Sequence, residues 1–189
     1  PDPLTPVKLR INGTGLKSGQ HIRHLTAEVG GGIGYAGPHF VHTFDLLLPP
    51  EKYFAEHPEY YALIDGKRTA KHLYSQPCLS NPDVLRIMIE GIRSWLRDNP
   101  EARLVSVSQN DSFVIGSYCT CPACRAVNEE EGAPSGSLIR FVNAVAEALE
   151  PEFPEVTFDT LAYQYSTQPP KLTHPRHNVA IRMCTGGGA

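Results

Sequence analysis

The sequence lacks the features that mark several large classes of protein. It has no excess of positive charge, because 17 Lys and Arg residues stand against 20 Asp and Glu residues and the basic ones are scattered. Clustered basic residues are what nucleic-acid backbones require, so we expect no nucleic-acid partner. No apolar run approaches the ~20 residues of a membrane-spanning helix, so we expect no membrane span. A charged start followed by an apolar core, as in a signal peptide, is also missing.

The composition favours one globular domain with irregular ends. The chain has 189 residues, of which 41% are hydrophobic, and this suffices to bury a core. We predict a Gly- and Pro-rich lead-in at 1–38, a domain at 39–185 and a Gly-rich tail at 186–189. Both ends look cut or engineered, so we expect that a targeting signal is missing from this chain.

Hydrophobic periodicity predicts alternating strands and helices from residue 39 onward. The clearest helix begins at the N-cap Asn81 and Pro82 and carries apolar residues at 3- and 4-residue spacing. Runs rich in β-branched residues predict the strands. The expected strands cover 39–44, 104–108, 156–163 and 179–184; the expected helices cover 51–57, 82–99 and 135–149.

This order of elements predicts an α/β fold. Strands separated by helices form βαβ units, which build a parallel sheet. A closed (β/α)8 TIM barrel typically needs about 250 residues. If the fold is of this type, the chain is therefore an incomplete barrel that contains roughly its central part.

The end of the strand at 104–108 carries the best candidates for chemistry. Gln109, Asn110 and Asp111 follow it directly. Functional groups gather beyond the carboxyl ends of parallel strands, and a carboxylate beside an amide there suits work on a sugar. An Asx turn that caps the loop is the alternative.

Aromatic and histidine residues at other strand ends are candidates for substrate binding. Tyr163 and Tyr165 can stack on a sugar ring, although core tyrosines with solvated hydroxyls fit the pattern equally well. His39 and His42 bracket an expected strand, whose alternation places them on opposite faces, so we expect no shared metal ion. His42 alone is a candidate for substrate binding.

Three cysteines within six residues indicate a structural site. Cys119, Cys121 and Cys124 have the spacing of a metal knuckle, and Cys78 is the natural fourth ligand. Zinc in a structural role is our preferred interpretation; a pair of disulfides, expected for an exported protein, is the alternative. The cluster lacks the His or carboxylate ligands usual in catalytic zinc sites, so we expect no cofactor for catalysis.

Several separated motifs, in order along 39–184, resemble glycoside hydrolase family 163, a bacterial family first catalogued as a domain of unknown function. The matching stretches are Pro49-Pro50-Glu51-Lys52-Tyr53-Phe54, the run from His57 to Arg68, Cys78-Leu79-Ser80-Asn81-Pro82, Ser108-Gln109-Asn110-Asp111, the cluster at Cys119, Cys121 and Cys124, Ala162-Tyr163-Gln164-Tyr165 and Ile181-Arg182-Met183-Cys184.

The resemblance implies a TIM-barrel endo-β-N-acetylglucosaminidase that is exported and acts on N-glycans of glycoproteins. It implies a retaining mechanism in which the 2-acetamido oxygen of the substrate attacks the anomeric carbon. Asn110 and Asp111 would then orient the acetamide, supported by Tyr163 or Tyr165, and no general acid is assigned.

The alternatives to this function are a non-catalytic carbohydrate-binding barrel, another hexosaminidase-like or glucuronidase-like hydrolase, and a zinc-knuckle interaction module. Asp45 and Asp65 are expected to be solvated or structural.

Overall fold

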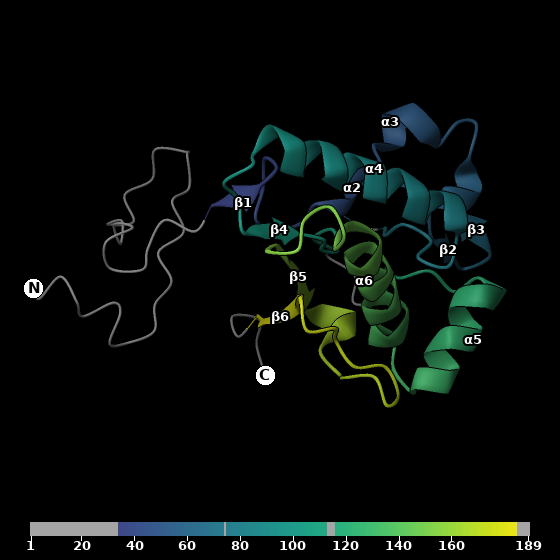
Figure 1. The fold of residues 1–189 in the computed structure, drawn as a ribbon. Coiled ribbons are helices and arrows are strands. Elements are labelled where there is room, and N and C mark those ends of the chain that lie inside the picture. Colours follow the sequence, from purple (N-terminus) through teal and green to yellow (C-terminus); the bar gives the residue numbers. More distant parts are fainter. Residues whose placement is uncertain (1–33, 74, 113–115, 185–189) are drawn as a thin grey trace, which may run out of the picture.

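A computed structural model of the protein describes residues 34–73, 75–112 and 116–184. Four strands form a parallel sheet in the order β1-β4-β5-β6 (Figure 1), made by β1 (Tyr35–Ala36), β4 (Leu104–Ser106), β5 (Thr157–Ala162) and β6 (Val179–Met183). The pairing brings Tyr35 beside Leu104, Val105 beside Phe158, and Thr160 beside Ile181. The predicted α/β class is therefore confirmed.

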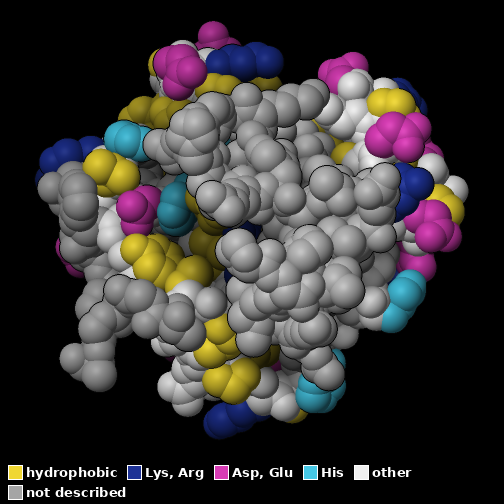
Figure 2. Space-filling view, turned by 90° about the vertical axis from the view of Figure 1, so that its left-hand side faces the viewer, with side chains coloured by type: hydrophobic (Ala, Val, Ile, Leu, Met, Phe, Trp, Pro, Cys, Tyr) yellow, Lys and Arg dark blue, Asp and Glu magenta, His cyan; other side chains and the backbone are white. Residues whose placement is uncertain are grey.

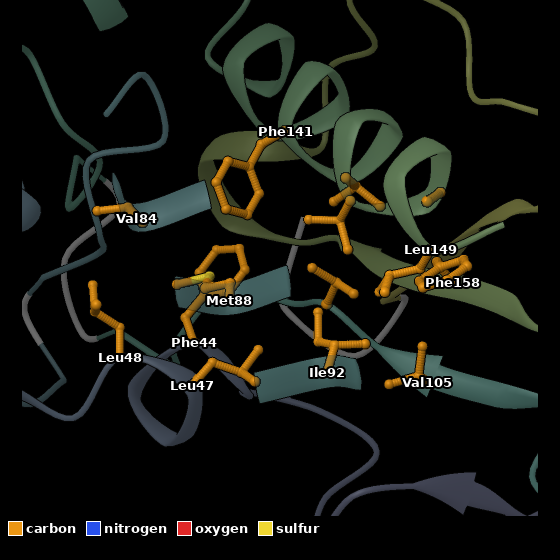
Figure 3. Packing of buried hydrophobic residues seen from close by; sticks show 14 of the residues in the cluster. Phe44, Leu47, Leu48, Val84, Met88, Ile92, Val105, Phe141, Leu149 and Phe158 are labelled. Atoms are coloured by element: carbon orange, nitrogen blue, oxygen red, sulfur yellow. The ribbon is translucent and has the colours of Figure 1, made fainter. Parts of the chain in front are cut away.

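Two long helices provide nearly half of the buried residues of the main hydrophobic core. These are α4 (Pro82–Asp98) and α6 (Ser135–Leu149). Figure 3 shows their buried side chains, among them Met88, Ile92 and Phe141, packed against Val105 and Phe158 of the sheet. Both helices agree with the sequence prediction, because an apolar stripe with helical spacing has to face a core.

The shorter elements surround this core. They are α2 (Phe44–Leu47), α3 (Pro50–Tyr53), the 3-10 turn η2 (Pro58–Tyr60), the hairpin strands β2 (Leu63–Ile64) and β3 (Lys67–Arg68), α5 (Pro122–Glu131) and the 3-10 turn η3 (Gln164–Ser166). Asp65 and Gly66 join β2 to β3 with positive φ angles, as a tight two-residue hairpin turn requires. No described helix combines the length and apolar character needed to cross a bilayer.

The two faces of the sheet differ at its centre. Val105 and Phe158 face the helices, whereas the next residue along each strand, Ser106 and Asp159, points to the other side. There the Asp159 carboxylate accepts a hydrogen bond from Tyr35 Oη at 2.5 Å and lies 3.0 Å from a guanidinium nitrogen of Arg182. This buried network joins β1, β5 and β6 across the sheet.

The strand predicted at 39–44 is wrong. Residues 39–43 form an irregular connection, Phe44 begins α2, and the first strand of the sheet lies earlier, at 35–36 within the expected lead-in. His42 has a φ of 54°, which interrupts an extended chain. Thr43 then binds the end of β4, because its Oγ1 donates to the carbonyl of Ser106 at 2.9 Å.

The helix α5 was not predicted. It begins with Pro122 directly after Cys121, but its sequence carries few apolar residues and ends in three glutamates. Its buried side chains in the described structure are Cys124 and Glu131, so it is held by the cysteine cluster and by polar contacts more than by an apolar stripe. Gly132, in the left-handed conformation, ends it.

Candidate functional site

The carboxylate of Asp111 meets the hydroxyl of Tyr163 where β4 and β5 end. Tyr163 Oη donates to Asp111 Oδ1 at 2.9 Å, and the backbone N–H of Ser112 donates to the same oxygen at 2.9 Å. This bond raises the pKa of Tyr163, because the neighbouring carboxylate favours the protonated hydroxyl. Two of the predicted site residues are therefore in direct contact, as expected for neighbouring parallel strands.

His42 lies beside this pair with a defined tautomer. Its Nδ1 is 2.8 Å from the carbonyl oxygen of Gln109, and its ring centroid is 6.1 Å from that of Tyr163. A carbonyl oxygen can only accept, so Nδ1 carries the proton and Nε2 of the neutral ring is an acceptor. His39 lines the same pocket as His42, so the prediction that the two occupy opposite faces is wrong.

Asn110 binds Asp45 instead of pointing freely into the site. Its Nδ2 donates to Asp45 Oδ1 at 2.6 Å and to the carbonyl of Ser75 at 3.1 Å, while its Oδ1 accepts the backbone N–H of Asp45 at 2.9 Å. Asn110 is only 5% exposed. These contacts give Asn110 a role in orienting the carboxylate of Asp45.

Asp45 is a second acidic group of the site. Burial raises its pKa above the ordinary carboxyl range, although hydrogen bonds from Asn110 and His72 act in the opposite direction. Its Oδ2 lies 3.6 Å from Nδ1 of the exposed His72. A carboxyl group with a raised pKa is suited to donate a proton.

These groups line one pocket with a volume of about 320 Å³. Its lining residues are His39, Val41, His42, Asp45, Leu46, His72, Leu73, Asn110 and Asp111. On the face shown in Figure 2, histidine, acidic and hydrophobic side chains lie next to one another at the left of the view. Apolar walls with a few convergent polar groups are typical of small-ligand sites.

Three of the predicted substrate-binding residues, Tyr163, Gln109 and Tyr165, are not among the residues that line this pocket, although Tyr163 contacts the lining residue Asp111. Gln109 is 1% exposed, and its Nε2 donates to the carbonyl of Leu161 at 3.0 Å and to Ser166 Oγ at 2.6 Å, so it ties the ends of β4 and β5 together. Tyr165 is buried against Tyr118, with ring centroids 5.2 Å apart. The core alternative considered for the tyrosines therefore describes the ring of Tyr165, but its hydroxyl is buried and not solvated.

A larger pocket of about 530 Å³ lies beside α5. It is lined by Tyr118, Cys119, Thr120, Arg125, Asn128, Glu129, Gly132, Ala133 and Pro134. No pair of acidic side chains meets there, since Glu129 is the one carboxylate of its lining. We therefore assign the candidate chemistry to the smaller pocket at the strand ends.

Asp45 and His72 are the site residues that the sequence did not identify. Asp45 lies in the first turn of α2, and His72 lies in the loop after β3. Asp45 follows β1 through the connection at 37–43, so the strand-end rule could have reached it, whereas His72 follows no strand of the parallel sheet and lies outside that rule. The signal available in the sequence was an acidic residue next to the misassigned strand at 39–44.

Four cysteines form a separate buried cluster. The sulfur atoms of Cys78, Cys119, Cys121 and Cys124 all lie within 4.8 Å of one another, with Cys78 Sγ at 3.6 Å from Cys121 Sγ and 3.8 Å from Cys124 Sγ. All are free thiols, and the sulfurs are farther apart than the ~2.05 Å of a disulfide. This arrangement can hold a metal ion. Cys184 is not part of it.

Hydrogen bonds within the cluster favour negative charge on one sulfur, that of Cys119. Hydrogen bonds from the thiols of Cys124 and Cys78, and from the backbone N–H of Leu63, hold the pKa of Cys119 far below its ordinary range. The hydrogen bond that Cys78 donates to Cys119 in turn raises the pKa of Cys78 to about 12. Arg68 Nη1 lies 3.7 Å from Cys119 Sγ. Without a cation, one thiolate is thus stabilised by its protonated neighbours.

Comparison with curated proteins and with solved structures finds no match. The model of one protein family matches most of the chain. This family is described as a domain of unknown function, DUF4838, and its model covers residues 14–186, which include the pocket and the cysteine cluster. The chain therefore belongs to the DUF4838 family.

Proposed function

We propose that the pocket at the strand ends is the catalytic site of a glycoside hydrolase. The observation that carries the proposal is that two acidic side chains, Asp45 and Asp111, line one pocket, and that Tyr163 donates a hydrogen bond to Asp111. Glycoside hydrolysis needs an acid and a carboxylate in different environments. Burial raises the pKa of Asp45, while Tyr163 and a backbone N–H donate to Asp111.

The resemblance to glycoside hydrolase family 163 supports an endo-β-N-acetylglucosaminidase that acts on N-glycans. In this mechanism the acetamide oxygen of the substrate attacks the anomeric carbon as the glycosidic C–O bond breaks. Asp111, held by Tyr163, accepts the acetamide N–H and so strengthens the attacking oxygen. Asp45 gives its proton to the leaving oxygen and later takes one from the water that opens the cyclic intermediate.

The remaining residues have supporting roles in this proposal. Asn110 orients Asp45, and Nε2 of His42 accepts a hydrogen bond from a sugar hydroxyl. The parallel sheet, with helices on one face and polar side chains on the other, forms part of a (β/α)8 barrel. A glycan or glycoprotein is the substrate, and the protein is exported.

The test follows release of glycans from a complex N-glycoprotein by mass spectrometry, using the full-length protein. We expect cleavage between the two core GlcNAc units. Asp111→Asn and Asp45→Asn should each lower kcat at least about 100-fold, in the range of a lost acid–base or orienting group. Tyr163→Phe should lower it about tenfold, because one hydrogen bond to a charged group is lost.

Asp65→Asn is the matched control, since Asp65 is an exposed acid in the hairpin turn. Its activity should equal that of the unmodified protein. If the protein binds glycans but releases none, the proposal of a hydrolase would give way to that of a carbohydrate-binding protein. Equal loss in all three Asp→Asn variants would remove the assignment of Asp45 and Asp111.

We further propose that the cysteine cluster holds zinc in a structural role. Four sulfurs at about 2.3 Å from a tetrahedral zinc ion lie about 3.8 Å apart, close to the 3.6 and 3.8 Å of Cys78 to its neighbours. Four thiolates favour zinc over harder cations. Four protein ligands leave no open position for water, so such an ion takes no part in hydrolysis.

Metal analysis of the purified protein tests this assignment. One zinc ion per chain is expected, and Cys124→Ser should lose it. Cys184→Ser is the control, because Cys184 lies outside the cluster. A metal-free protein with intact free thiols would refute the zinc site.

A further inference from the structure

We infer that the cysteine cluster, when it holds its metal, positions the catalytic pocket through Gln76. The inference rests on the proposed zinc site and connects it to the proposed active site. Cys78 and Gln76 are separated by one residue, Pro77. The metal would thus fix one end of a short segment whose other end contacts the pocket.

On the side of the cluster, the segment 75–78 is hydrogen-bonded to residues 60–62, which lead into the hairpin of β2 and β3. The backbone N–H of Cys78 donates to the carbonyl of Tyr60 at 2.8 Å, and that of Ala62 donates to the carbonyl of Gln76 at 2.8 Å. The hairpin in turn contacts the cluster, because the Leu63 N–H lies 3.3 Å from Cys119 Sγ. A metal bound to both cysteines would lock these contacts together.

On its other side the segment holds Asn110 by both backbone groups. Gln76 Nε2 donates to the carbonyl of Asn110 at 2.9 Å, and the N–H of Asn110 donates to Gln76 Oε1 at 2.9 Å. Ser75 adds its carbonyl, which accepts from Asn110 Nδ2. Gln76 is 2% exposed, so solvent does not compete for these bonds.

Asn110 transmits this fixation to the two acidic groups. Its side chain binds Asp45, and Asp111 follows it in the chain. The path from metal to pocket is therefore Cys78, Gln76, Asn110 and then the carboxylates. Loss of the metal should loosen Asn110 although the cysteines do not touch the pocket.

Hydrogen exchange tests the inference without reference to activity. The readout is the amide of Asn110, with the amide of Phe158, which bonds to the carbonyl of Asn178 in the sheet, as an internal reference. In Cys124→Ser, exchange at Asn110 should rise about tenfold, a usual size for coupling between sites, while Phe158 stays protected. Cys184→Ser should change neither amide.

Gln76→Leu makes the test independent of whether Cys124→Ser folds. It keeps all four cysteines but removes both bonds to the Asn110 backbone, so exchange at Asn110 should again rise about tenfold with zinc still bound. Because coupling between sites is reciprocal in binding free energy, the affinity of Gln76→Leu for zinc, measured by competition with a chromophoric chelator, should be several-fold lower than that of Cys184→Ser. If Gln76→Leu leaves the affinity for zinc unchanged, the inference fails, whether or not the protein is a hydrolase.

Discussion

At the residue scale, Glu131 shows how a fully buried charge is tolerated. Its carboxylate accepts from Arg140 Nε at 2.7 Å and from the backbone N–H groups of Leu172 and Thr173 at 2.9 and 3.0 Å. Burial raises the pKa of Glu131, but hydrogen bonds from Thr173, Leu172 and Arg140 outweigh it and lower the pKa to about 2. The ionised form therefore stabilises the link between α5 and the segment after β5.

Replacing Glu131 with Gln should cost about 3 kcal/mol of unfolding free energy, because Arg140 loses its buried partner. Glu130→Gln is the control; Glu130 also contacts Arg140 but is largely exposed, so we expect less than about 1 kcal/mol. Urea unfolding measures both.

The difference in unfolding free energy between the unmodified protein and Glu131→Gln should depend on pH in a defined direction. Because the folded pKa of Glu131 lies below its ordinary value of 4.5, its stabilisation is present above pH 4.5 and is lost as the pH falls toward 2. The gap between the unmodified protein and Glu131→Gln should narrow over that window. A gap that stays constant would mean that the charge does not contribute.

At the element scale, the elements predicted correctly are those whose local signals agree with their packing. For α4, the N-cap Asn81, Pro82 and the apolar stripe all indicate the same helix, and the structure places it at Pro82–Asp98. The strands β4, β5 and β6 were predicted because each is rich in β-branched and other apolar residues, although β6 lies at the edge of the sheet and exposes Ile181 and Met183. The run at 39–44 has strand composition but folds around Thr43 and Phe44 to close the end of β4.

The same reasoning explains what could be predicted of the site. Asp111 and Tyr163 follow strands, and their contact results from β4 and β5 being neighbours in the sheet. Asp45 meets Asn110, 65 residues away, because Thr43 and Phe44 bind the end of β4, and no local pattern encodes that contact. Tyr165 follows a strand as well, but η3 turns it into the core.

The N-cap of α4 gives a prediction for this element. Asn81 Oδ1 accepts from the backbone N–H groups of Asp83 at 2.9 Å and Val84 at 3.4 Å. Asn81→Ala should therefore cost about 1 kcal/mol in urea unfolding. Asp98→Ala, at the other end of the helix, should be neutral or stabilise by a few tenths of a kcal/mol, since an acidic residue near a helix C-terminus is unfavourable. Equal effects at both ends would contradict the capping role.

At the scale of the whole molecule, the network on the polar face holds the sheet together. Arg182 of β6 pairs with Asp159 of β5, which also accepts from Tyr35 of β1. Burial raises the pKa of Asp159, and Tyr35 and Arg182 counteract this rise. The network thus lets three strands share one buried carboxylate.

Arg182→Met should destabilise the protein by about 3 kcal/mol at neutral pH, since it leaves Asp159 charged and poorly paired. Because the folded pKa of Asp159 is raised further, the stability that Arg182→Met loses relative to the unmodified protein should be smallest below the ordinary carboxyl value of 3.8 and should grow as the pH rises. Adding Asp159→Asn to Arg182→Met should recover part of the loss in urea unfolding. No recovery would show that Arg182 acts through packing alone.

The cysteine cluster also has a consequence for the order of events as the protein matures. In the empty cluster Cys78 has two free thiols at similar distances, 3.6 and 3.8 Å away, so oxidation has no single preferred product. Different pairings would draw the loop of Cys78 toward different partners and leave other thiols unpaired. If the metal binds before the protein meets an oxidant, all four cysteines are metal ligands and a single form of the protein results. For an exported chain, the timing of metal binding would therefore decide how much protein matures correctly.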